Sequence, residues 1–207
     1  MKFFTLLLLT LFIASCASVA PQSYAPPMQQ NYSNTITFDR SKDEVWAALV
    51  DSASGSFFAI KNFERDSGLM TLDFGSSRPE DFVDCGTWTG GGYVDANYIL
   101  RNKGSGLSMS LSGVMNLLVL ELDENKTSLR VNARYILNMN GSRVSYNYMT
   151  GASYSVPTLD TFTFDSNGSD SIMVSNPALG TIPSRTCTPT GLAERQIVDG
   201  VSETLRQ

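Results

Sequence analysis

Residues 129–137 alternate between apolar and polar side chains, in the order Leu129-Arg130-Val131-Asn132-Ala133-Arg134-Tyr135-Ile136-Leu137. A β-strand directs successive side chains to opposite faces of its sheet, so this pattern places the odd-numbered apolar residues together on one face. The charged and amide side chains between them lie on the other face. Such alternation is typical of an antiparallel sheet with one buried and one solvated face. The segment therefore predicts a long strand in a sheet-dominated domain.

The period of two extends to both sides of this segment. On the N-terminal side, apolar residues interleave with serines, and a turn is expected at Asn125-Lys126. The pattern then continues toward the C-terminus. The apolar residues that follow it are Leu107, Met109, Leu111, Leu118, Leu120, Leu122, Val144, Tyr146, Tyr148, Phe162 and Phe164.

A hairpin is expected earlier in the chain. Residues 57–65 and 69–74 form its arms, and Asp66-Ser67-Gly68 forms its turn. Met70, Leu72 and Phe74 share one face of the second arm. A shorter strand is expected at residues 35–38.

Two helices complete the pattern. Ser41-Lys42-Asp43-Glu44 is a capping box, and the apolar residues after it recur at helical spacing until Gly55. A second helix closes the chain, with Thr190 as the expected N-cap. Its apolar stripe consists of Ile197, Val198, Val201 and Leu205. The fold class is therefore α+β, an antiparallel β-meander gripping a C-terminal helix, with a short N-terminal helix.

This order of elements resembles the helix-grip architecture of BamC-type envelope lipoproteins. Several short segments carry the resemblance, and they cover most of residues 34–207: Phe38-Asp39-Arg40-Ser41, Phe57-Phe58-Ala59-Ile60, Asp66-Ser67-Gly68-Leu69, Leu72-Asp73-Phe74, Phe82-Val83-Asp84-Cys85-Gly86 and Cys187-Thr188-Pro189-Thr190-Gly191-Leu192-Ala193-Glu194. The resemblance implies a single helix-grip domain over 34–207. BamC-type proteins have two such domains, so no functional residue is carried over.

The N-terminus has the form of a bacterial lipoprotein signal. Lys2 precedes an apolar stretch at residues 3–13, which is too short to span a bilayer. Ile13-Ala14-Ser15-Cys16 resembles a lipobox, which implies cleavage after residue 15 and acyl chains on Cys16. The alternative is an ordinary secretory signal with an incidental cysteine. Ala17 after the cysteine favours the outer membrane by resemblance to lipoprotein sorting, with the domain facing the periplasm and surface exposure left open.

The segment at residues 16–33 is predicted to be a flexible tether. It contains Pro21, Pro26 and Pro27 and no charged residue, so it has little apolar surface to bury. Tyr24 and Tyr32 are the alternative, as short docking points for a partner.

The two remaining cysteines, Cys85 and Cys187, are expected to form a disulfide in an oxidising compartment. Two buried free thiols are the first alternative. A reactive thiol is the second, although neither cysteine has a C-x-x-C spacing or a histidine partner.

Composition excludes several classes of function. The chain of 207 residues has no histidine, which removes the usual general base and the Ser-His and Cys-His dyads. Its net charge is −5 and no basic cluster occurs, so nucleic acid is not an expected partner. No cofactor and no metal ion is expected.

Three segments are candidates for polar sites. Glu80, Asp81 and Asp84 lie beside Cys85 and offer either acid–base chemistry or a solvated acidic loop. Residues 165–170 have the composition of a calcium loop but not its spacing, so a polar hairpin turn is expected. Residues 90–92 are three glycines in an expected mobile loop and not a phosphate-binding loop.

The aromatic residues and methionines are expected mainly in the core. The set comprises Phe57, Phe58, Phe63, Phe74, Met109, Met115, Tyr135, Tyr146, Tyr148 and Phe162. An apolar cleft beneath the closing helix is the alternative. The sequence thus favours a non-enzymatic outer-membrane lipoprotein that binds or scaffolds another envelope protein. The alternative function is a carrier of lipid or of a small apolar ligand in a helix-grip cavity.

Overall fold

The computed structural model describes residues 23–28, 33–89, 108–168, 170–172, 175–176, 180–181 and 185–207. The expected signal peptide at 1–15, Cys16, Leu107, Tyr32 and the glycine loop at 90–92 lie outside the described residues.

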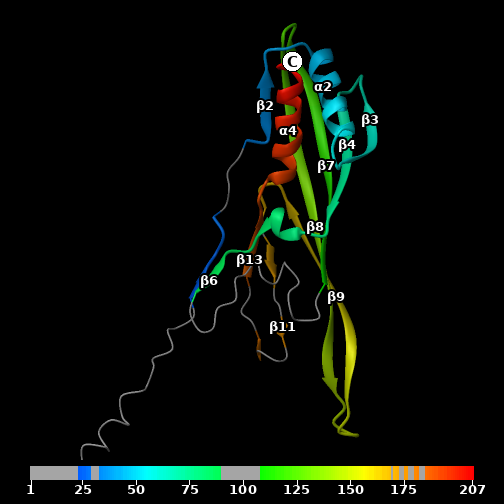
Figure 1. The fold of residues 1–207 in the computed structure, drawn as a ribbon, viewed down its shortest axis with the longest axis vertical. Coiled ribbons are helices and arrows are strands. Elements are labelled where there is room, and N and C mark those ends of the chain that lie inside the picture. The colour runs from blue at the N-terminus through cyan, green and yellow to red at the C-terminus, as the bar shows by residue number, and fades with distance from the viewer. Residues whose placement is uncertain are drawn as a thin grey trace, which may run out of the picture.

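Antiparallel strands dominate the structure and two helices pack on them, which confirms the α+β class (Figure 1). The main sheet has the order β2-β8-β7-β4-β3, and β9 pairs with β8 beside β2. The strands are β2 (Thr35–Phe38), β3 (Ala59–Glu64), β4 (Leu69–Ser76), β7 (Ser108–Asp123), β8 (Lys126–Tyr146) and β9 (Ser153–Asp165). The expected hairpin of β3 and β4 and the expected turn between β7 and β8 are both present.

Strand β8 is the longest strand of the main sheet and pairs with three others. One of its sides pairs with β7 from Lys126 to Asn140. Its other side is divided, because β2 pairs with residues 127–130 and β9 pairs with residues 134–146. The 21-residue length of β8 therefore joins the helix-covered part of the sheet to a hairpin that projects from it (Figure 1).

Shorter strands form small sheets beside the main one. Strand β1 (Ser23–Ala25) pairs with β6 (Thr87–Thr89), and β13 (Arg185–Pro189) lies between β10 (Asp170–Ile172) and β5 (Val83–Asp84). Strands β11 (Ser175–Asn176) and β12 (Gly180–Thr181) pair with each other, and a 3₁₀ helix, η1 (Pro79–Asp81), precedes β5. The expectation of an unstructured tether is wrong at residues 23–25. Backbone pairing with β6 orders this segment despite its polar composition.

The structure also corrects the buried face of β7. Met115, Leu117 and Val119 are buried, whereas Leu120 and Leu122 are 38% and 55% exposed. Because β7 runs unbroken from Ser108, the odd positions that are buried at its start stay buried as far as Val119. The four consecutive apolar residues at 117–120 hide this alternation in the sequence.

The first helix, α2 (Lys42–Ser54), begins and ends as the sequence predicts. The Ser41 hydroxyl accepts a hydrogen bond from the Glu44 backbone N–H, and the Ser41 backbone N–H donates to the Glu44 carboxylate. These reciprocal bonds satisfy donors that the first helical turn leaves without partners. Gly55 follows the helix as its C-cap.

This capping box makes stability depend on pH. Hydrogen bonds from the Ser41 side chain and backbone, together with the nearby Arg40 charge, lower the pKa of Glu44 below its ordinary value of 4.5. The stabilisation is therefore present above that ordinary value and is lost as the pH falls through the folded-state pKa. Glu44→Gln should unfold at lower urea than the natural chain at neutral pH, and the two should converge as the pH falls below the folded-state pKa of Glu44. A difference that stays constant across this range would exclude the carboxylate as its source.

The second helix, α4 (Leu192–Thr204), begins one residue later than expected. Gly191 is the N-cap, with a left-handed φ of 72°, and no side chain caps the helix. The Thr190 hydroxyl donates to the Asp81 carbonyl and accepts from Leu192 N–H. Thr190 thus connects the start of the helix to η1. The left-handed conformation of the N-cap falls on Gly191, and a glycine adopts it without strain because it has no Cβ.

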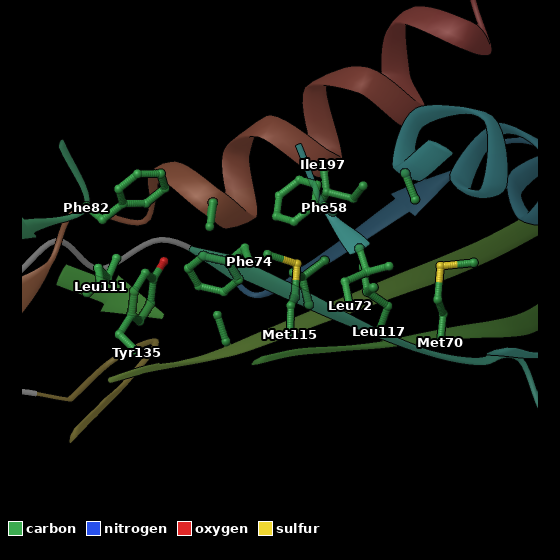
Figure 2. Packing of buried hydrophobic residues seen from close by; sticks show 14 of the residues in the cluster. Phe58, Met70, Leu72, Phe74, Phe82, Leu111, Met115, Leu117, Tyr135 and Ile197 are labelled. Atoms are coloured by element: carbon green, nitrogen blue, oxygen red, sulfur yellow. The ribbon is translucent and has the colours of Figure 1, made fainter. Parts of the chain in front are cut away.

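Both helices have 13 residues and cover the same face of the sheet (Figure 1). They approach closely at Gly200, where an added Cβ would lie 2.2 Å from Ser52 Oγ. Val45 and Leu49 from α2 join Ile197 and Val201 from α4 in one core cluster with the inward residues of β4, β7 and β8. Figure 2 shows Ile197, Leu72 and Met115 in the layer between α4 and the strands.

An aromatic pair organises the centre of this core. Phe74 and Tyr135 lie on either side of Gly113 in adjacent strands, and their ring centroids are 5.3 Å apart (Figure 2). The Phe74 ring lies over the glycine, since an added Cβ at Gly113 would be 2.1 Å from Phe74 Cζ. The Phe74 ring occupies the space that a side chain at position 113 would fill.

Candidate functional site

The disulfide region joins three parts of the chain that are distant in sequence. The sulfur atoms of Cys85 and Cys187 are 2.03 Å apart, the separation of a disulfide bond. Both residues are buried, at 2% and 1% exposure. The adjacent strands β5 and β13 pair through Asp84 and Thr188. This cystine is enclosed by protein and links the strand that leads into α4 to the segment that follows η1.

Tyr24 adds the N-terminal segment to this cluster. Its hydroxyl lies 3.0 Å from the carbonyl oxygens of Cys85 and Thr186, and 3.0 Å from the Thr186 backbone nitrogen. Gly86 adopts a left-handed φ of 74° and lies close to the backbone at Ala25. An added Cβ at Gly86 would be 2.3 Å from the Ala25 carbonyl oxygen. Tyr24 therefore docks within its own chain.

The three acids beside the disulfide have separate local roles. Arg78 lies 3.0 Å from Asp81 and 3.9 Å from Glu80, while Asp84 accepts a hydrogen bond from Gly86 N–H. The other carboxylate oxygen of Glu80 is buried and has no hydrogen-bond partner in the described part of the chain. Within the same residues, no group of three His, Cys, Asp or Glu side chains is arranged to hold a metal ion.

The polar segment after β9 forms a turn but not a hairpin. Gly168 N–H donates to Asp165 C=O, as expected of a turn, but the next strand, β10, pairs with β13 and not with β9. The Asp165 carboxylate accepts a 2.9 Å hydrogen bond from Arg134 and raises the pKa of that guanidinium. Both charges of this exposed pair are engaged with each other.

A pocket with a volume of about 770 Å³ lies next to this turn. Its lining includes Asn116, Asn132, Arg134 and Asp165. These residues belong to the sheet face opposite the helices, because the odd-numbered positions of β7 and β8 face the core. The space beneath α4 holds packed side chains instead (Figure 2). The expected aromatic set is accordingly divided: Phe58, Phe74, Met109, Met115 and Tyr135 are buried, Phe162 is partly buried, Phe57, Phe63 and Tyr148 are exposed, and Tyr146 lies outside the described side chains.

A buried polar pair in the core was missed at the level of the sequence. Glu194 on α4 is 3% exposed, and its carboxylate accepts a hydrogen bond from the buried Tyr135 hydroxyl. Glu194 occupies the helical spacing i, i+3, i+7 with Ile197 and Val201, so it belongs to the apolar stripe by position. That spacing was the available signal. A carboxyl group on the inward stripe requires a polar partner across the layer.

The strongest candidate for recognition is the edge of the main sheet at β3. Every residue of β3 is exposed, and among the described strands β3 pairs only with β4. A register shift between Ile60 and Asn62 marks a β-bulge at Lys61. Ile60 pairs with Leu72 and Phe63 with Met70, so the bulge brings both side chains to the helix-covered face.

These two side chains extend the apolar face beyond the cover of the helices. Ile60 is 37% exposed and Phe63 is 61% exposed, whereas their partners on β4 are buried. Phe57, which precedes β3, is 46% exposed, and its ring stacks 4.4 Å from that of Phe58. We term Ile60 and Phe63 the edge strip.

Comparisons of the chain with protein-family models, with curated proteins and with solved structures gave no match. Within the described part, neither helix is long and apolar enough to cross a membrane.

Proposed function

We propose that this chain is a non-enzymatic lipoprotein of the bacterial outer membrane that binds an extended segment of another envelope protein along β3. The lipobox-like sequence ending at Cys16 supports the anchor. A helix-grip-like, BamC-like assignment of the domain rests on the packing of α4 across the sheet and on the short segments that resemble that group. The single observation that carries the binding function is the outer edge of β3, which no described strand covers, with the edge strip on one face.

The edge offers two complementary kinds of contact. The outward N–H and C=O groups of an edge strand accept an additional strand by hydrogen bonding. Alternate side chains of that incoming strand would then cover Ile60 and Phe63, which already lie on a single face. An extended apolar segment satisfies both requirements at once, whereas a helix satisfies only the second.

The charges of β3 do not oppose such pairing. Edge strands are commonly protected from unwanted partners by lysines and other charged residues. Here Lys61 is ion-paired with Asp73 at 2.8 Å, and Arg65 with Asp43 at 2.9 Å. Both cations therefore have partners within the domain, and β3 presents the exposed apolar side chains of Ile60 and Phe63 beside them.

Site-specific photo-crosslinking in living cells tests this function. A photoreactive amino acid at Phe63 or Ile60 should give one adduct of defined mass, identified by mass spectrometry as an envelope protein. Leu122 is the matched control, because it is an exposed apolar residue that lies at the end of β7, away from β3. The control position should give no such adduct.

Three outcomes would contradict the proposal. No adduct at either β3 position would remove the binding site, and the same adducts at all three positions would show unspecific contact. An adduct with a second copy of this chain would replace the envelope partner by self-association. Mass spectrometry of the N-terminal peptide tests the anchor separately, because acyl chains on Cys16 add a defined mass.

A further inference from the structure

The hairpin of β8 and β9 projects beyond the rest of the main sheet (Figure 1). The pairing of β7 with β8 ends at Ser108 and Asn140, whereas β8 pairs with β9 as far as Tyr146 and Ser153. Beyond Asn140, the described structure is thus a two-stranded ribbon. Two strands alone bury little surface and are marginally stable in water. A projection of this kind is better accounted for when its end rests on another phase or molecule.

The turn at the end of the ribbon satisfies its own backbone. The Asn147 side chain accepts hydrogen bonds from the N–H groups of Met149 and Thr150. The Gly151 N–H donates to the Asn147 carbonyl, and the Asn147 N–H donates to the Ala152 carbonyl. Backbone donors without partners are the main cost of placing a loop in an apolar medium. Much of that cost is already removed in this turn.

Exposed apolar and aromatic side chains lie at this end, among polar ones such as Asn147 and Thr150. Tyr148 is 92% exposed and Met149 is 95% exposed, and Tyr154 near the start of β9 is 54% exposed. We term Tyr148, Met149 and Tyr154 the tip cluster. Tyrosine is the residue that prefers the boundary between water and lipid, since its ring is apolar and its hydroxyl is hydrated.

The charge distribution favours a membrane over water at the same place. The chain carries 20 acidic residues, yet none occurs between Glu124 and Asp160. The one charged residue between Asn140 and Asp160 is Arg143, a cation. The surface of a bilayer with anionic lipids repels acidic protein surfaces and attracts basic ones. The ribbon is therefore a part of this acidic chain that can approach such a surface.

The position of β1 relates the N-terminal segment to the ribbon. Strand β1 lies near the middle of the molecule, in the half from which the ribbon projects, whereas β3 and most of the two helices lie in the other half (Figure 1). Between Cys16 and Ser23 the chain can extend about 25 Å at most. Acyl chains on Cys16 would consequently hold this half toward the bilayer.

We infer that the tip cluster inserts into the interface of the bilayer to which Cys16 anchors the chain. The inference rests on the proposed anchor and gives the domain a fixed orientation. The ribbon stands on the membrane, and the edge strip at β3 points away from it toward soluble partners.

A fluorescent label that reports polarity tests the insertion. Met149→Cys in the full chain is labelled with a nitrobenzoxadiazole group and reconstituted in vesicles of phosphatidylethanolamine and phosphatidylglycerol. Its emission should shift to shorter wavelength and should be quenched by lipids that carry a quencher. The same label at Lys61→Cys, on exposed β3, should behave as in water. Adding Tyr148→Asp should reverse the shift at position 149, with no effect on folding expected at so exposed a residue.

The same sample separates the two proposals. If mass spectrometry shows acylated Cys16 and the label at position 149 remains aqueous, the insertion is wrong and the anchor stands. If Cys16 is unmodified, the anchor is wrong. The emission of the label with added vesicles then shows whether the ribbon inserts without the anchor. A label that is shielded by envelope extracts but not by pure lipid would overturn the insertion in favour of a protein contact.

Discussion

Replacing Cys85 by serine is expected to lower the free energy of unfolding by about 2–5 kcal/mol, the usual effect of removing a native disulfide from a small secreted domain. The bond to Cys187 closes a span of 102 residues, which contains β7, β8 and β9. Opening a loop of about 100 residues releases up to ~4.7 kcal/mol of constraint on the unfolded chain in the entropic description. Urea denaturation with and without reductant measures this difference.

The loss should be felt first in α4. Strand β13 leads from Cys187 through Gly191 into the helix, and near this junction Thr190 donates hydrogen bonds to the carbonyls of Phe82 and Asp81. Hydrogen exchange should therefore accelerate in residues 192–204 before it does in β8. The double replacement of Cys85 and Cys187 should cost about the same as the single one, because the two residues act as a unit. Alkylation of both thiols without reductant would show that no disulfide is present.

Tyr135→Phe is expected to lower the free energy of unfolding by about 1–3 kcal/mol, the cost of removing a hydrogen-bond partner from a buried polar group. The substitution keeps the ring that packs on Phe74 and removes only the hydroxyl that donates to Glu194. The carboxylate is then left in the core without this donor. Glu194→Leu should also destabilise the protein, because the Tyr135 hydroxyl loses this buried acceptor.

The double variant distinguishes pairing from packing. In the double variant, neither polar group remains in the core without the other. Tyr135→Phe with Glu194→Leu should therefore cost less than the sum of the two single changes. Equilibrium unfolding of the four proteins gives the coupling energy. Phe162→Leu, at a partly buried aromatic position on β9, is a control for changes in aromatic packing. Additive costs would mean that the hydrogen bond contributes little.

Much of the fold can be predicted from the sequence because several of its elements depend mainly on residues that are close together in the chain. The alternation from Leu129 to Leu137 specifies a strand and its inward face, and the capping box at Ser41 specifies where α2 begins. The cysteine count indicates the pairing of Cys85 with Cys187, which the structure places at bonding distance. Each of these features depends on neighbouring residues or on a small number of possible partners.

Other features depend on distant contacts and were therefore not visible. The inward face of β7 at Leu117 and Leu118 follows from the continuity of the strand, because an apolar run has no alternation of its own. The pairing of β1 with β6 depends on Tyr24 reaching two carbonyl groups, at Cys85 and Thr186, that are far away in sequence. Local composition predicted a tether at this segment.

By itself the sequence determined the α+β class, the lipobox-like N-terminus, the disulfide pair and the absence of histidine chemistry, since composition and short-range periodicity are enough for each. The tertiary structure alone decided where surfaces remain uncovered. Ile60 and Phe63 are apolar residues that would be buried in a central strand, and they are exposed because β3 is at the edge. Glu194 carries a carboxyl group and yet is buried, because α4 turns it toward Tyr135. Burial is a property of the packed chain and not of the residue, which is why the candidate recognition surfaces required the structure.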